Sequence, residues 1–242
     1  MRIALDAVAK GRRDAALPAT SLAYATGRAT LAIAETEQRP TVLGLIASGR
    51  MAPDAGTVAL DGETGRRATA AIRRGVALVD APDVSDPAPN VTVAGVVGEE
   101  LMFAGRTADP IAARRWLEAH GLRGRARLPI ADLGAAERIR ILLELAAARP
   151  GVEGLVLVSP DRHGGDPAAW WLIAQEFAAR GLAVLVIAGE SSASALTAAT
   201  DLRSAESAAR LRASRVRPRW TVRRGRTTPS TPSTPSTRER RR

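Results

Sequence analysis

The 242-residue sequence has no cysteine, two histidines and a single lysine, Lys10. Without cysteine the chain can form no disulfide and no thiolate metal site, and it has no thiol nucleophile. His120 and His163 alone cannot supply a multi-histidine metal cluster. Aromatic residues make up only 3%, so a core must be built from Ala, Val, Leu and Ile, and the 45% hydrophobic content allows this.

Long apolar runs are also absent. The sequence has no stretch of about 18 consecutive apolar residues of the kind that spans a bilayer. Its N-terminus lacks the pattern of a signal peptide. We therefore expect a cytoplasmic protein.

The positive charge is concentrated near the C-terminus. The formal net charge is +10, but residues 202–242 hold thirteen arginines against two glutamates, which amounts to about +11. Residues 1–201 are therefore close to neutral. Thr-Pro-Ser repeats three times over 228–236, and proline at every third position is incompatible with a helix. We expect a disordered basic tail at 206–242 that is either solvated or binds an anionic membrane surface or nucleic acid.

Upstream of the tail, apolar runs alternate with helical patterns. Helices are predicted from Val42 to Ala47, from Asp109-Pro110, over 135–148 and from Asp166-Pro167 to Ala179. Strands are predicted at 29–33, 57–62, 75–79, 154–158 and 181–187. Strands that alternate with helices are typical of an α/β fold with a mostly parallel sheet.

The loop at 34–41 joins the 29–33 strand to the first predicted helix. Strand, loop and helix is the context in which G-x-x-x-x-G-K-[ST] binds phosphates through backbone N–H groups and a lysine. Here Ala34 and Arg39 occupy the glycine positions and Pro40 the lysine position, and only Thr41 is retained. We expect the Thr41 hydroxyl to cap its own helix.

Further segments follow at the spacing found in one family. Residues 49–62 read Gly-x-x-x-Pro-Asp-x-Gly-x-Val-x-x-Asp-Gly. Later segments are Leu133, Gly134, Ala135, Ala136 and Glu137 at a helix start, Ser159-Pro160 after the 154–158 strand, and Gly164 with Asp166. Over residues 1–205 the chain resembles the ATP-binding subunit of an ABC transporter. The later segments are similar to its signature, its Walker B strand end and its D-loop. The resemblance implies a P-loop NTPase-like fold with a small helical subdomain at about 82–150.

The departures from the family pattern fall on the residues to which the resemblance assigns chemistry. Pro40 replaces the lysine that grips the phosphates, and Ser159 replaces the aspartate of the magnesium shell. Pro160 stands in place of the general base, Ala81 in place of the Q-loop glutamine and Gly189 in place of the switch histidine. We therefore expect no catalytic residue, no metal ligand and no cofactor beyond weak Mg-ATP binding.

Two further residues lie near these positions. The strand register argues against Asp161 as a displaced metal ligand. We expect His163 to be a surface loop residue, because no carboxylate-and-serine arrangement is indicated around it.

Three functions remain open. The first is a catalytically inactive, structural or regulatory partner of an ABC permease or of an active ATP-binding subunit, in a hetero- or homodimer at the inner face of the cell membrane. The second is a genuine subunit that binds ATP and hydrolyses it slowly, with Arg39 and Thr41 as phosphate contacts. In the third the arginine tail is the functional part.

Overall fold

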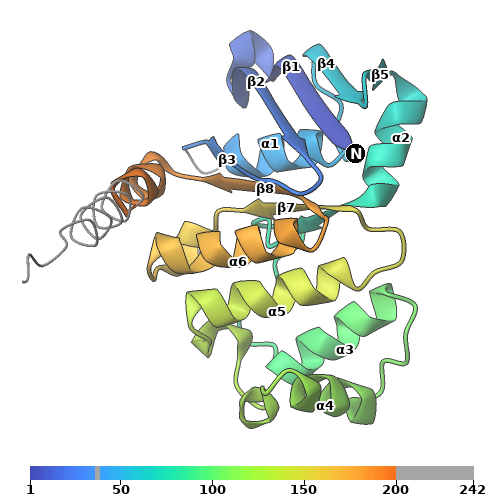
Figure 1. Cartoon of the computed structure of the whole chain (residues 1–242), viewed down its shortest axis with the longest axis vertical. Coiled ribbons are helices and arrows are strands. Elements are labelled where there is room, and N and C mark those ends of the chain that lie inside the picture. The colour runs from blue at the N-terminus through green and yellow to red at the C-terminus, as the bar shows by residue number, and fades with distance from the viewer. Residues whose placement is uncertain (36–38, 200–242) are drawn as a thin grey trace, which may run out of the picture. The chain divides into compact units, whose positions relative to one another are not determined.

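The computed structural model describes residues 1–35 and 39–199, which contain two four-stranded sheets (Figure 1). In the first sheet the strands are antiparallel and follow the order β2-β1-β4-β5. These strands are β1 (Arg2–Lys10), β2 (Leu17–Ala25), β4 (Ala55–Leu60) and β5 (Glu63–Thr64).

The second sheet is parallel and follows the order β3-β8-β7-β6. Its strands are β3 (Ala29–Ile33), β6 (Val76–Val79), β7 (Gly154–Val158) and β8 (Ala183–Ala188). Every residue of β6, β7 and β8 is buried, which explains their continuous apolar sequences. β7 lies between β8 and β6, so the prediction of a buried strand at 154–158 is confirmed.

Six helices have defined bounds in the described part of the chain. They are α1 (Arg39–Ala47), α2 (Arg66–Gly75), α3 (Val93–Phe103), α4 (Pro110–Ala119), α5 (Ala135–Ala147) and α6 (Pro167–Ala179). Asp109 and Asp166 cap α4 and α6, where each carboxylate accepts a hydrogen bond from a backbone N–H of the first turn. Single-turn 3-10 helices lie at Arg12–Asp14, Arg123–Arg125, Ile130–Asp132 and Pro160–His163, and residues 190–199 are also helical.

The two faces of the parallel sheet belong to separate cores. Val156 and Val158 of β7 pack with α1 and the antiparallel sheet, so α1 lies between the two sheets (Figure 1). Leu155 and Leu157 of the same strand pack against α5 and α6, beyond which lie α3 and α4. The alternation places successive side chains of one buried strand in different layers.

The prediction of a mostly parallel sheet was wrong, because the strands are divided equally between a parallel and an antiparallel sheet. The strands missed are β1, β2 and the two-residue β5. In β1, Ile3 and Leu5 alternate as expected, but Ala7 has a φ of 47° and the pairing with β2 shifts register between Leu5 and Val8. This bulge moves the buried positions to Val8 and Ala9, which breaks the period of two in the sequence.

The turn that precedes β4 fixes the antiparallel sheet through one carboxylate. Asp54 accepts hydrogen bonds from Lys10 Nζ at 2.6 Å and from the Gly11 amide at 2.9 Å. These contacts hold the pKa of Asp54 below its ordinary value. Gly56 has a φ of 78°, and a Cβ there would lie 2.3 Å from the Ala7 carbonyl oxygen. Backbone geometry thus requires Gly56, and the side-chain contacts of Asp54 hold the turn against β1.

The helices α3, α4 and α5 all lie in the chain between β6 and β7. The division into a cassette-like domain at 1–205 with a helical subdomain at 82–150 stays a prediction. The basic tail predicted at 206–242 lies outside the described residues. Among the described helices, none is long and apolar enough to cross a membrane.

Candidate functional site

Several of the residues singled out in the sequence lie in the loops that follow the strands of the parallel sheet. β3, β7 and β8 end at Ile33, Val158 and Ala188 and pair in parallel. Because the carboxyl ends of parallel strands meet at one edge, the loops that follow them come together, and in open α/β sheets ligands bind at this edge. The edge brings Glu35, Asp161 and Gly189 close to one another.

Two carboxylates accept hydrogen bonds from the backbone amides at this edge. Asp161 Oδ2 accepts hydrogen bonds from the Gly189 amide at 2.8 Å and from Ser192 Oγ at 3.3 Å. Glu35 Oε1 accepts one from the Glu190 amide at 2.9 Å. These amides begin the helical segment 190–199, whose positive end favours anions. The protein therefore supplies its own anions at this helix start.

At Gly189, where the resemblance places a switch histidine, the same contact leaves little room for a side chain. A Cβ added to Gly189 would lie 3.2 Å from Asp161 Oδ2 and 3.5 Å from Glu35 Oε1. The first distance is tighter than ordinary van der Waals contact, so a side chain at 189 would press on the Asp161 carboxylate. Asp161 is therefore a capping group, a role that the sequence analysis missed.

The phosphate-loop positions lie at the start of α1. Residues 36–38 are outside the described part of the chain, and α1 begins at Arg39. Pro40 is buried in the first turn, where a helix tolerates proline because the N–H has no intrahelical partner there. The Thr41 Oγ1 atom is buried and has no hydrogen-bond partner among the residues that the structure describes. Our expectation that this hydroxyl caps its own helix was therefore wrong.

Ser159 and Pro160, at the positions that resemble the end of a Walker B strand, carry no carboxylate that could bind a metal or act as a general base. Ser159 has left-handed backbone angles, φ 47° and ψ 54°, and its amide donates to the Ile187 carbonyl at 2.8 Å. Pro160 is buried at the start of the following 3-10 helix. No group of three or more His, Asp or Glu side chains able to hold a metal occurs among the described residues. The side chains at 159 and 160 therefore supply no carboxylate to a magnesium ion or to an attacking water.

The signature-like segment begins α5. Leu133 is buried, Gly134 precedes the helix, and Ala135 and Ala136 form its first turn. The Glu137 carboxylate pairs with Arg125 Nε at 3.1 Å. In the D-loop-like segment, Gly164 has a φ of 72°. Asp166 caps α6 through the amide of Ala168 at 2.9 Å.

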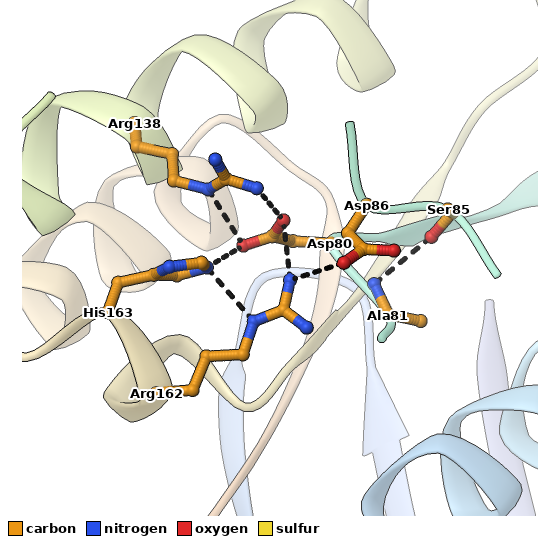
Figure 2. A network of polar contacts seen from close by, with 7 residues as sticks. All are labelled: Asp80, Ala81, Ser85, Asp86, Arg138, Arg162 and His163. Atoms are coloured by element: carbon orange, nitrogen blue, oxygen red, sulfur yellow. Dashed lines mark hydrogen bonds and ion pairs between the residues drawn. The ribbon is translucent and has the colours of Figure 1, made fainter. Parts of the chain in front are cut away.

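A buried ionic network, missed by the sequence analysis, lies at the end of β6 (Figure 2). The Asp80 side chain is fully buried and contacts Arg138 Nη2 of α5 at 2.7 Å. It also contacts Arg162 Nη2 at 3.0 Å and His163 Nε2 at 2.7 Å, both from the 3-10 helix after β7. Asp86 reaches Arg162 at 3.4 Å. The network joins three segments that are distant in sequence.

The electrostatics of this network favour an ionised Asp80. Burial alone would raise the pKa of its carboxyl, but hydrogen bonds from His163 and Arg138, together with the charges of Arg138 and Arg162, outweigh burial. The pKa of Asp80 therefore lies below its ordinary value. His163 is a half-buried partner of this carboxylate, so our expectation of a surface loop residue was wrong. The neighbouring Ala81 is buried, and its amide donates to Ser85 Oγ at 3.1 Å.

One signal in the sequence could have indicated this network. Asp80 follows the apolar run 76–79 directly, and a carboxylate at the end of a buried strand needs a partner. In the described part of the chain, the basic side chains that contact it come from segments 58 or more residues away. The sequence therefore shows the need for a partner but not which residue meets it.

Comparison with solved structures identifies the architecture. A dimeric bacterial ABC transporter cassette superposes with a TM-score of 0.56 over 78% of this chain and 88% of its own, at 18% identity. A nucleotide-free ATP-binding cassette from an ABC transporter gives 0.55 over 78% and 82%, at 16% identity. The cbiO1 protein of Clostridium perfringens, part of the ABC transporter complex cbiONQ, gives 0.53 over 77% of each chain, at 16% identity.

The chain has the fold of an ABC transporter ATP-binding cassette. Neither protein-family models nor the sequences of curated proteins match it. At such low identity the cassette likeness concerns the fold, and the chemistry must be argued from the residues themselves. At the edge of the parallel sheet, those residues are Asp161 and Glu35, whose carboxylates accept hydrogen bonds from the Gly189 and Glu190 amides.

Proposed function

We propose that this chain is a non-hydrolysing cassette subunit that acts as a structural or regulatory partner in an ABC transporter. Its partner would be a permease or an active ATP-binding subunit at the cytoplasmic face of the membrane. The observation that carries the proposal is the pair of carboxylates, Glu35 and Asp161, on the amides at the edge of the parallel sheet.

The argument is electrostatic. A triphosphate that approached this edge would meet two carboxylates instead of free N–H donors, and like charges repel at short range. To bind, it would have to displace Asp161 from the Gly189 amide and Glu35 from the Glu190 amide. Each charge-assisted hydrogen bond of this kind contributes about 1.5–3 kcal/mol. That cost comes in addition to the missing lysine at Pro40.

Hydrolysis needs further groups that these positions lack. A positioned general base contributes about two to four orders of magnitude in rate. Pro160 has no proton acceptor in its side chain. Ser159 has no carboxylate for a magnesium shell, and its backbone is committed to β8 through the Ile187 carbonyl. Two independent arguments therefore support the proposal: the carboxylates oppose nucleotide binding, and the groups needed for hydrolysis are missing.

Calorimetric titration with Mg-ATP, combined with an ATPase assay, tests the proposal. We expect no saturable binding in the micromolar range and a rate equal to that of buffer. A variant with Pro40→Lys, Ser159→Asp and Pro160→Glu should still lack turnover, because Ala81 and Gly189 are unchanged. A dissociation constant in the low micromolar range for the unaltered protein would refute the proposal.

The partnership is tested separately, by isolating native complexes and identifying their members by mass spectrometry. Recovery of a permease or of a second cassette subunit would support the proposed role. Reproducible recovery of the chain without either would count against it.

One observation favours the second candidate function, slow hydrolysis by a genuine ATP-binding subunit. The Thr41 Oγ1 atom is buried and lacks a hydrogen-bond partner within 1–35 and 39–199, as a hydroxyl that binds a ligand would. If this candidate were correct, Mg-ATP would bind, and Thr41→Val would weaken that binding while Thr69→Val on α2 would not. The Thr69 hydroxyl is a matched control because it bonds only within its own helix region, to the Gly65 carbonyl.

A further inference from the structure

A cavity of about 500 Å³ beside α4 is lined by four arginines, Arg114, Arg115, Arg123 and Arg127, and by a single acidic residue, Glu118. Arg114 and Arg115 belong to α4, and Arg123 begins the 3-10 helix Arg123–Arg125. Leu117, which is fully buried, lines the same cavity. The cavity thus combines an apolar contact with four cationic side chains.

The acidic groups nearby are already engaged. Glu118 pairs with Arg123 at 3.0 Å, and Asp109 uses its carboxylate to cap α4 through the Ala112 amide at 2.7 Å. Within the described part of the chain, Arg114, Arg115 and Arg127 form no ion pair or side-chain hydrogen bond. Three guanidinium groups that share one cavity without a counter-ion repel one another, and a bound anion would relieve that repulsion.

The chemistry of the lining indicates the class of anion. Guanidinium groups present planar sets of N–H donors that match the oxygens of a phosphate, and several arginines together select phosphate over a single carboxylate. We propose that this cavity binds a phosphate-bearing group, supplied either by a soluble polyphosphate or by a phospholipid headgroup. Ile111, at the cavity edge, has 61% of its surface exposed, which leaves an apolar contact for the remainder of either ligand.

This site is separate from the cassette nucleotide position. That position lies at the ends of β3, β7 and β8, whereas α4 lies beyond α5 on the other side of the parallel sheet (Figure 1). The inference therefore does not depend on the proposed function. Failure of either leaves the other intact.

The test uses the full chain and a double variant, Arg114→Gln with Arg127→Gln. Both side chains are exposed, so the fold should be retained, and circular dichroism checks this. The matched control is Arg66→Gln with Arg67→Gln, two exposed arginines at the start of α2. The control has the same net charge, and both variants retain the arginines of 202–242.

Two probes distinguish the sources of phosphate. Inorganic pyrophosphate is titrated calorimetrically, and hydrogen exchange locates its protection among residues 110–128. Flotation with phosphatidylglycerol vesicles, compared with phosphatidylcholine vesicles, reports a headgroup. Because the double variant lacks two of the guanidinium groups that line the cavity, it should bind at least about tenfold more weakly, a difference of about 1.4 kcal/mol, and the control should match the unaltered protein.

Each outcome decides the matter. Binding of pyrophosphate that is lost in the double variant supports a soluble polyphosphate, and loss of flotation alone supports a lipid headgroup. Equal binding by the double variant and the control would overturn the proposal. A single-stranded oligonucleotide is titrated in the same way, and binding confined to it would also overturn the proposal, because the arginines would then form a nucleic-acid surface.

Discussion

Replacement of Asp80 by asparagine should destabilise the fold by about 3–5 kcal/mol, which is typical when one partner of a buried ion pair is removed. The effect is large because Arg138 would keep its charge while only 5% of its side chain is exposed. Asparagine has nearly the same shape, so packing changes little. The loss should amount to a substantial fraction of the about 5–15 kcal/mol that stabilises a typical domain.

The difference in unfolding free energy between the unaltered protein and the Asp80→Asn variant should depend on pH in a defined direction. The carboxyl of Asp80 has a pKa lowered from its ordinary 3.8, so the ionised form is favoured by folding. Its stabilising contribution is fully present above pH 3.8 and is lost as the pH falls below that value towards the pKa of the folded state. The two unfolding free energies should therefore differ most near neutral pH and converge in acid.

Urea unfolding monitored by circular dichroism at several pH values measures both effects. Asp86→Asn is the matched control, because Asp86 contacts Arg162 at 3.4 Å with 31% of its side chain exposed. It should cost less than about 1 kcal/mol, as exposed ion pairs do. If Asp80→Asn lay within 1 kcal/mol of the unaltered protein at neutral pH, the network would be dispensable and the reasoning wrong.

Three other substitutions test separate parts of the structure by urea unfolding. Gly44→Ala should destabilise by about 1–3 kcal/mol, because the new methyl would lie 2.8 Å from Val158 Cγ2; an unchanged midpoint would refute the close packing of α1 on β7. Tyr24→Phe should cost about 1 kcal/mol, since the buried hydroxyl donates to the last carbonyl of α1 at 2.7 Å; a neutral result would show that this bond adds nothing. Asp161→Ala should cost about 1 kcal/mol by removing the cap of the 190–199 helix, and equal stability would contradict the capping role.

Most of the parallel sheet could be predicted, because each of its buried strands is a continuous run of apolar residues in the sequence. Leu155–Val158 is a continuous apolar run, and the structure places it in the centre of the sheet with both faces covered. The starts of α4 and α6 were equally visible, because Asp-Pro at each start combines a capping carboxylate with a proline that the first turn accepts.

The site contacts could not be predicted in the same way. Asp80 and His163 are 83 residues apart, and Glu35 and Glu190 are 155 apart. The resemblance to cassette segments led us to expect replaced groups, but it did not indicate that the Asp161 and Glu35 carboxylates would accept hydrogen bonds from the Gly189 and Glu190 amides. The role of Asp161 follows from a 3-10 turn that carries its side chain back to β8, and nothing in the local sequence specifies that turn.

The segment most similar to a cassette in sequence needs no nucleotide to explain it. Asp54 holds Lys10 and the Gly11 amide, and Asp61 accepts from the Arg2 amide at 2.7 Å. Gly56 meets the Ala7 carbonyl so closely that no other residue fits. These residues therefore stabilise the antiparallel sheet whether or not a phosphate is bound. A chain could keep them under packing constraints alone while its strand-end loops turned their carboxylates inward. The cassette fold and the self-occupied edge of its sheet are thus physically compatible in one protein.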